Sequence, residues 1–165
     1  MHDLAALFRV RFIRELWRRL GRDLADRPIA LYGAGRHTAW LLNTVADVEG
    51  GPRIAFILDD AAKADALAGY PVVKPSDARP EDVASVFISS DSNEAKLAER
   101  AQAWIRSASA NTHTSVIEPY KGLPAGPYSN IEATGGSTSG NRTLPSCLDE
   151  DAIDRAKALG AGYPV

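Results

Sequence analysis

The sequence predicts an α/β fold, a three-layer Rossmann-like parallel sheet with an amphipathic helix at the N-terminus and an irregular C-terminal tail. Two observations lead to this fold class. Short apolar segments alternate with helical segments between residues 28 and 120, and such alternation implies right-handed crossovers between parallel strands. The apolar segments also lack the polar–apolar alternation of half-exposed strands, as expected for a sheet covered on both faces. Counted along the chain, the expected strands give the order 3-2-1-4, half of a doubly wound fold.

Each expected strand is a short apolar run bounded by turn residues. The first is "IALY", and the second, "IAFIL", ends at a pair of aspartates. Asp91, with Glu94 three residues later, matches the capping box that opens a helix. Residues 61–68 are predicted to form a short helical turn, and "GYPVV" a brief extended piece. We expect strands at 29–32, 54–58, 83–89 and 114–118, and helices at 36–48 and 91–105.

The N-terminal segment, residues 3–24, is predicted to be one amphipathic helix. Its apolar residues recur at spacings of three and four, which gives a broad apolar stripe, while arginines occupy the other face. We expect the stripe to pack partly on the edge of its own domain and partly on a second copy or a partner enzyme. A basic amphipathic helix at a membrane surface, or a targeting segment, is the alternative. The apolar residues are Leu4, Leu7, Phe8, Phe12, Ile13, Leu16, Trp17, Leu20 and Leu24.

The C-terminal segment has a different composition. Residues 121–145 are rich in Gly, Pro, Ser, Thr and Asn and show little periodicity, which is typical of a linker or a loosely ordered tail. A short helix is expected at residues 149–159. Cys147 lies in this tail with no histidine near it in sequence, so a nucleophilic role is not expected.

The composition excludes several classes of protein. The chain has 165 residues and a formal net charge of −2, so no positive field favours nucleic acid as a partner. A single cysteine excludes an internal disulfide framework, and the three histidines lack metal-ligand spacing. No apolar run approaches the roughly 20 residues of a membrane span, and no secretory h-region is present. We therefore expect a cytoplasmic protein with no metal site.

The stretch "IALYGAGRHTAWLL" carries the chemistry that the sequence suggests. A strand leads into Gly33, a helix opens after Gly35, and Asp59 ends the following strand. In a nucleotide site Gly33 supplies the tight turn and Gly35 lets the backbone approach a pyrophosphate at the helix N-terminus. Thr38 stands where the G-x-G-x-x-G fingerprint has its third glycine, and we expect it to push helix and strand slightly apart. The alternative is a turn of the same shape that binds nothing.

The neighbouring polar residues complete the expected site. Arg36 and His37 open the helix, where both could contact phosphate, and His37 could also act as a general acid or base. Asp59 is at the distance along the chain at which an acid reaches a ribose hydroxyl, and its charge favours NAD over NADP. Ser89 ends the third strand, at the edge where ligands of open α/β sheets gather. No residue is assigned a catalytic role.

These motifs resemble a known type of segment. "IALYGAGRHTAWLL", "FILDD", "LAGYPVVKP" and "VFISSDSNEAKLAER" together resemble the Rossmann-like nucleotide-binding segment of bacterial sugar acyltransferases and of sugar C-methyltransferase C-terminal domains. The resemblance covers residues 27–120. It implies a nucleotide pocket formed by the glycine turn and the acid after the second strand, without the catalytic parts of those families. The chain accordingly divides into an N-terminal helix (1–27), a nucleotide-binding domain (28–120) and a tail (121–165).

The expected function is binding of NAD(P) or a nucleotide-sugar-like ligand by an accessory or regulatory module. One alternative is a small NAD-dependent oxidoreductase, or a component of a sugar-modifying enzyme, that a partner completes. The other is a protein-interaction module with a vestigial nucleotide site. No Tyr-x-x-x-Lys pair of a short-chain dehydrogenase is present, so the sequence alone does not choose among them.

Overall fold

The computed structural model describes residues 4–108 and 112–123. The elements lie close to their predicted places, with helix and strand ends shifted by a few residues. The predicted tail helix at 149–159 and Cys147 lie outside the described residues. In chain order the elements are α1 (Leu4–Leu24), β1 (Ile29–Tyr32), α2 (Arg36–Val45), β2 (Ile54–Leu58), β3 (Ala66–Leu67), β4 (Tyr70–Val73), the 3₁₀ turns η1 (Pro75–Asp77) and η2 (Pro80–Asp82), β5 (Ser85–Ile88), α3 (Glu94–Arg106) and β6 (Ser115–Ile117).

The strands form one mixed, mostly parallel sheet of six strands in the order β3-β4-β2-β1-β5-β6. The central strand β1 pairs in parallel with β2 on one side and with β5 on the other. Both β1 and β5 are buried along their whole length. Burial on both faces explains why these strands are uniformly apolar or small in sequence.

The predicted strand order is not the observed one. The expected third strand, β5, pairs with β1 rather than with β2. The place beside β2 belongs to β4, which pairs with it in parallel at Ile57–Val72 and Leu58–Val73. The helical turn predicted at 61–68 is also wrong, because residues 66–67 pair with β4 as the short antiparallel strand β3.

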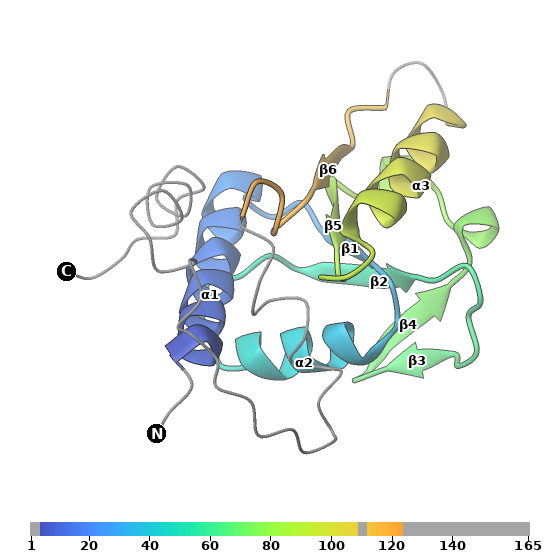
Figure 1. Cartoon of the computed structure of the whole chain (residues 1–165). Helices are drawn as coiled ribbons and strands as arrows, with labels where there is room; N and C mark the ends of the chain where they lie inside the picture. Colours follow the sequence, from blue (N-terminus) through green and yellow to red (C-terminus); the bar gives the residue numbers. More distant parts are fainter. Residues whose placement is uncertain (1–3, 109–111, 124–165) are drawn as a thin grey trace.

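Helices cover both faces of the sheet (Figure 1). On one face α1 and α2 pack over side chains from Ile29, Leu31, Ile57 and Phe87. On the other face α3 packs over the alternate residues of the same strands, and its Trp104 belongs to this second cluster. The chain therefore has two apolar layers separated by one sheet, as the sequence predicts.

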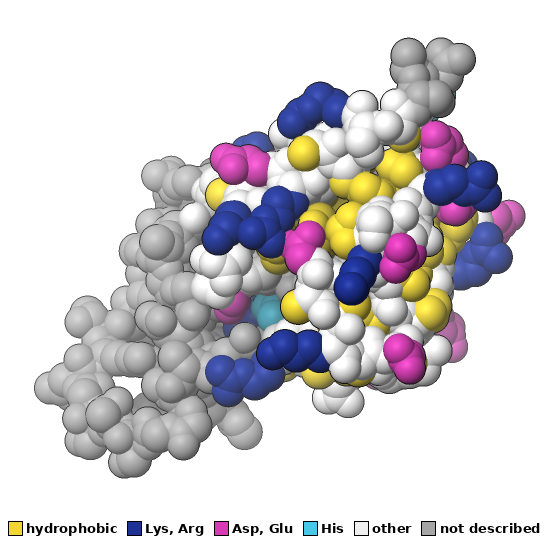
Figure 2. Space-filling model, turned by 90° about the vertical axis from the view of Figure 1, so that its right-hand side faces the viewer, with side chains coloured by type: hydrophobic (Ala, Val, Ile, Leu, Met, Phe, Trp, Pro, Cys, Tyr) yellow, Lys and Arg dark blue, Asp and Glu magenta, His cyan; other side chains and the backbone are white. Residues whose placement is uncertain are grey.

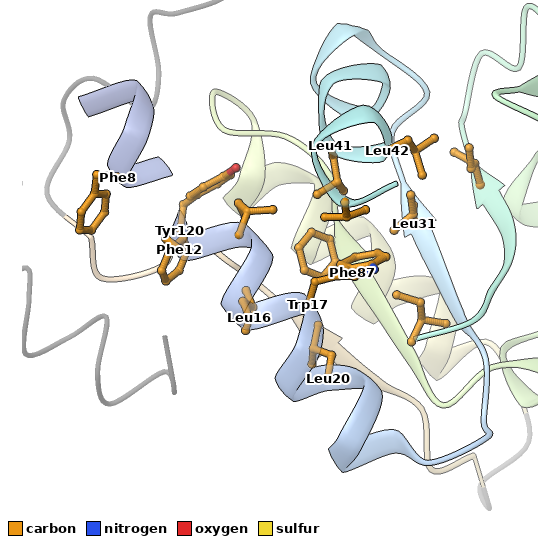
Figure 3. Close-up of a cluster of buried hydrophobic side chains, with 14 of the residues drawn as sticks. Phe8, Phe12, Leu16, Trp17, Leu20, Leu31, Leu41, Leu42, Phe87 and Tyr120 are labelled. Carbon is orange, nitrogen blue, oxygen red and sulfur yellow. The ribbon is translucent and has the colours of Figure 1, made fainter. Parts of the chain in front are cut away.

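Helix α1 is part of the core rather than an appendage. Figure 3 shows its apolar side chains lying over the sheet, where Trp17 packs edge-on against Phe87 with ring centroids 5.5 Å apart. Leu7, at 49% exposure, is the only large apolar side chain left exposed among the described residues. The domain itself therefore buries most of the stripe, and packing of the rest on a second copy or a partner enzyme stays a prediction. The stripe residues that are buried are Phe8, Phe12, Ile13, Leu16, Trp17 and Leu20.

Two glycines let α1 approach the loop before β2. A Cβ on Gly21 would lie 1.7 Å from the carbonyl oxygen of Gly50, and a Cβ on Gly51 would lie 2.4 Å from the Trp17 ring. Neither contact is sterically allowed, so the helix packs here against bare backbone. The close approach fixes the position of α1 along the sheet.

The Gly21→Ala variant tests this packing. On an exposed helix the change from Gly to Ala stabilises by about 0.5–1 kcal/mol. Here we expect the opposite sign, a loss of about 1–3 kcal/mol in the free energy of unfolding, because the methyl group overpacks the interface. Urea denaturation measures the difference, with Arg22→Ala on the exposed face of α1 as the control. An alanine variant as stable as the parent protein would contradict the close approach.

Candidate functional site

The residues that the sequence selects meet at the carboxyl ends of β1, β2 and β5. The connection from β1 runs through α2 on one face, and the connection from β5 runs through α3 on the other. A crevice opens where the two crossovers diverge, and ligands of open α/β sheets bind at such a place. A cavity of about 430 Å³ lies there; we call it the switch-point pocket. All of the predicted site residues line it: Gly33, Gly35, Arg36, His37, Asp59 and Ser89.

The two glycines of the turn play different parts. Gly33 has φ of +106°, and a Cβ there would lie 3.2 Å from the carbonyl oxygen of Ser89. It is therefore required by both its backbone conformation and its crowding. Gly35 is the N-cap of α2 with an extended backbone, and a Cβ there would meet no atom within 4 Å. The space beside Gly35 is open on the side of the pocket.

Thr38 ties the turn to β5 rather than pushing the elements apart. Its side chain is fully buried, its hydroxyl donates to the Gly33 carbonyl, and it lies 2.8 Å from the Ser89 hydroxyl. Ser89 Oγ in turn lies 3.2 Å from His37 Nδ1, and His37 Nε2 lies 2.7 Å from the Tyr120 hydroxyl. A carbonyl only accepts hydrogen bonds. Thr38 is therefore the donor in its contact with Gly33.

The hydroxyl contacts link the turn to β5 and to the end of β6. Thr38 Oγ1 donates toward both the Gly33 carbonyl and Ser89 Oγ. Each His37 ring nitrogen has one partner, Ser89 Oγ at Nδ1 and the Tyr120 hydroxyl at Nε2, and the tautomer of the ring decides which nitrogen donates. Every member of this buried polar chain is satisfied, which fixes the turn against β5 and the end of β6.

The structure gives the His37 side chain a buried role within the protein, and a contact of this residue with a ligand stays a prediction. The ring is 4% exposed, and both of its nitrogens are engaged inside the protein. Burial, together with the charge of Arg9, lowers the pKa of His37 to about 3. The ring is therefore neutral at ordinary pH. The backbone N–H of His37 belongs to the first turn of α2, whose N–H groups have no acceptor within the helix.

Asp59 is largely occupied by the backbone around it. Its Oδ2 accepts the N–H of Ala34 at 2.8 Å, and its Oδ1 accepts from Ala61 at 2.8 Å and Ala62 at 3.0 Å. Burial by itself raises the pKa of Asp59, but these three bonds outweigh it and hold the pKa below its usual value. The carboxylate has about four acceptor positions. One position, on Oδ2, is left for a ligand hydroxyl.

Two helix N-termini line the pocket, and neither has a side-chain cap. Gly35 caps α2 without a side chain, and the Asn93 side chain makes no capping bond at α3. The first N–H groups of a helix have no acceptor within it and carry partial positive charge. Lys96 and Arg100 of α3 and Arg36 of α2 add basic side chains to the lining. The arrangement is suited to an anion.

The capping box predicted at the start of α3 is wrong. The helix begins at Glu94, after the predicted cap, and the Asp91 carboxylate is instead paired with Arg9 of α1 at 3.4 Å. Glu94 accepts the backbone N–H of Tyr120 at 2.8 Å. Burial raises the pKa of Glu94 to about 7 in spite of that bond. Glu94 thus connects the start of α3 to the segment after β6 and does not belong to the lining of the switch-point pocket.

A second hollow, of about 440 Å³, adjoins the switch-point pocket. Tyr32, Asp60 and Arg100 line both, and they form a wall between them. The Tyr32 hydroxyl donates to Asp60 Oδ1 at 2.9 Å, and Arg100 pairs with Asp60 Oδ2. Beyond the wall the lining is more apolar, with Pro75, Ala103 and Trp104.

A larger hollow than the switch-point pocket, about 590 Å³, lies near the amino ends of β2 and β4. Its lining includes Trp17, Val45 and Tyr70 but no charged side chain. It therefore offers no charged side chain to an anion.

On the face in Figure 2, basic and acidic side chains are interspersed around an apolar area, so this face has no continuous basic patch of the kind that nucleic acids need.

Within the part of the chain that the structure describes, no group of three or more His, Cys, Asp or Glu side chains could hold a metal ion. Nor is any described helix long and apolar enough to cross a membrane. Comparison with protein-family models, curated proteins and solved structures finds no significant match. The resemblance drawn from the motifs therefore stays a prediction, and function is inferred from the geometry of the pocket.

Several residues of the site were missed from the sequence. Lys96 and Arg100 are four residues apart and thus share one face of α3, a signal that the sequence did contain. Tyr32 and Asp60 lie next to Gly33 and Asp59, but the sequence does not show that Tyr32 and Arg100 both bond to Asp60. Tyr120 carried no local signal, because its role comes from a bond to His37, far away in sequence.

The His37 ring offers a direct test of the buried polar chain. We expect its NMR signals to stay constant from about pH 8 to about pH 5, because its folded pKa lies below that range. An unfolded histidine takes up a proton at about pH 6.5, so acidification below this value should lower stability by about 1.4 kcal/mol per pH unit from this group. The exposed His113 ring serves as the reference signal. Titration of His37 near neutral pH would contradict the bonding scheme.

Proposed function

We propose that this protein binds a nucleotide that carries a diphosphate, NAD or a nucleotide-sugar-like ligand, in the switch-point pocket. The observation that carries the proposal is the convergence of two uncapped helix N-termini, α2 and α3, on one cavity that three basic side chains also line. Helix N-termini stabilise phosphate through free N–H groups and the helix dipole. Arg36 adds a planar fork of donors suited to phosphate oxygens.

The strand order supports the same proposal. With β4 as the third strand, the order β4-β2-β1-β5 corresponds to 3-2-1-4, and the pocket lies at the point where the order reverses. This is the arrangement in which Rossmann-like sheets bind dinucleotides. The cavity volume falls in the range of about 300–1,000 Å³ typical of small-molecule sites.

The adjoining hollow extends the fit from a phosphate to a nucleotide. It begins at the Tyr32–Asp60–Arg100 wall and continues along an apolar lining that includes Trp104. A base placed there would lie beside apolar side chains while its phosphates lie at the helix ends. Asp59 Oδ2 retains one acceptor position, enough for one ribose hydroxyl.

A binding role fits the pocket better than a catalytic one. The neutral His37 ring has no free nitrogen. The acids are also committed, Asp59 to backbone N–H groups and Asp60 to Tyr32 and Arg100. General acid–base catalysis needs a group able to reach and exchange a substrate proton. We therefore propose an accessory or regulatory module that senses or carries its ligand.

Gly35→Asp separates binding from folding. An aspartate at an N-cap accepts an N–H bond and stabilises the helix, by up to about 1 kcal/mol relative to glycine. The same carboxylate would occupy the anion site, so we expect the affinity for NAD or UDP-glucose to fall by about ten-fold or more, which is about 1.4 kcal/mol. Calorimetry measures the affinity, and thermal unfolding should show unchanged or higher stability.

Gly35→Asn is the matched control, because it supplies a cap of the same size without the charge. We expect it to weaken binding less than Gly35→Asp does, since only the steric part of the effect remains. Equal affinity of the parent protein and Gly35→Asp would exclude the α2 N-terminus as the phosphate site. Absence of binding by the parent protein to either probe would contradict the proposed ligand class.

The charge of Asp59 predicts a preference between the two nicotinamide dinucleotides. The carboxylate stays ionised at neutral pH because its pKa is lowered, and it would repel a 2′-phosphate at short range. We expect NAD to bind about ten-fold more tightly than NADP, or about 1.4 kcal/mol. Parallel titrations at low and high salt measure the ratio. A preference for NADP would show that Arg36, rather than Asp59, faces that end of the ligand.

A further inference from the structure

A buried ion pair connects α1 to the loop that forms one wall of the switch-point pocket. Arg9 and Asp91 approach to 3.4 Å, and their side chains are 2% and 3% exposed. The Arg9 guanidinium also lies over Trp40 of α2, 4.0 Å from the ring centroid, and 5.8 Å from the centroid of Tyr120. One side chain of α1 therefore touches α2, the segment after β6 and the loop after β5.

The loop between β5 and α3 has residues of two kinds. Ser90, Ser92 and Asn93 line the pocket. Asp91 lies among them in sequence, but its carboxylate is buried against Arg9 instead. The Ser90 hydroxyl accepts the N–H of Asn93 at 3.1 Å, which closes the loop into a tight turn. The buried carboxylate is thus the anchor of a short loop whose other side chains form the pocket wall.

We propose that Arg9 and Asp91 are positioning residues for the ligand of the switch-point pocket, an inference that rests on the proposed function. They touch no ligand themselves. Their contact holds the loop after β5, and with it the uncapped start of α3, at the distance from α2 that a shared phosphate requires. A helix that precedes the sheet in sequence thereby sets the width of the site.

The electrostatics explain why the contact defines one loop position. Within the described residues Asp91 Oδ2 makes no hydrogen bond, so this oxygen relies on the charge of Arg9. A buried charge that loses its partner is strongly unfavourable, whereas replacement of both partners by neutral groups is often tolerated. Movement of the loop away from Arg9 would leave a buried charge without its partner, so the ion pair holds the loop in one position. A neutral pair would leave it folded but without that constraint.

The test compares two α1 ion pairs in otherwise identical proteins. The double variant Arg9→Met with Asp91→Asn removes the buried pair without leaving an isolated charge. The control, Arg14→Met with Asp47→Asn, removes the exposed pair between α1 and the end of α2, which has a 2.6 Å contact and side chains 27% and 74% exposed. Affinity for NAD and UDP-glucose is measured by calorimetry well below the unfolding temperature of each variant. Hydrogen exchange of the amides of residues 90–96 is measured without ligand.

We expect the Arg9/Asp91 variant to stay folded, to bind about ten-fold more weakly and to exchange the loop amides about ten-fold faster. The control should change neither. Unchanged exchange and affinity in a folded Arg9/Asp91 variant would overturn the positioning role, and so would a lower unfolding temperature with unchanged affinity. If the parent protein binds neither probe, the proposed ligand class fails. The exchange measurement then decides the positioning of the loop by itself.

Discussion

The carboxyl edge of the sheet depends on how closely the end of β1 approaches the end of β5. At Gly33 the distance is so short that a single added methyl group would meet the Ser89 carbonyl. Only glycine meets both the positive φ and the crowding, and the backbone turns there into α2. The chain of bonds from Tyr120 through His37, Ser89 and Thr38 then holds the turn in place. Because this chain is fully bonded and buried, the pocket above it has a rigid floor.

The same edge provides a site for an anion, although the formal net charge of the protein is −2. Two of the residues that line the pocket are aspartates, and most acceptor positions of their carboxylates are already used within the protein. Asp59 is bonded to three backbone N–H groups, and Asp60 is held between Tyr32 and Arg100. The helix N-termini, Arg36 and Lys96 are left to define the potential, because Arg100 is paired with Asp60. Local bonding, rather than net charge, determines which ligand the pocket favours.

The elements and site residues whose signal is local could be predicted. A few neighbouring residues are enough to predict each apolar strand and the glycine turn. The structure places Gly33, Gly35 and Asp59 around one cavity. The strand order could not be predicted, because β4 is short and carries Pro71, which lacks the N–H of a ladder donor. Nor could the start of α3. The sequence offers Asp91 as a cap, but burial against Arg9 takes the carboxylate away from the helix.

The departures from these local signals share one physical origin, which also explains what α1 does. Thr38, His37 and Asp91 each have an obvious local role, as a spacer, a phosphate ligand and a helix cap, and each makes a buried contact with a residue distant in sequence. Such contacts gather on the face of the sheet that α1 covers, where Arg9 and Tyr120 lie within one polar cluster. Helix α1, an amphipathic extension by its sequence pattern, therefore completes the interior beneath the pocket. Its apolar stripe supplies the stability, and its one buried arginine supplies the connection between that stability and the geometry of the site.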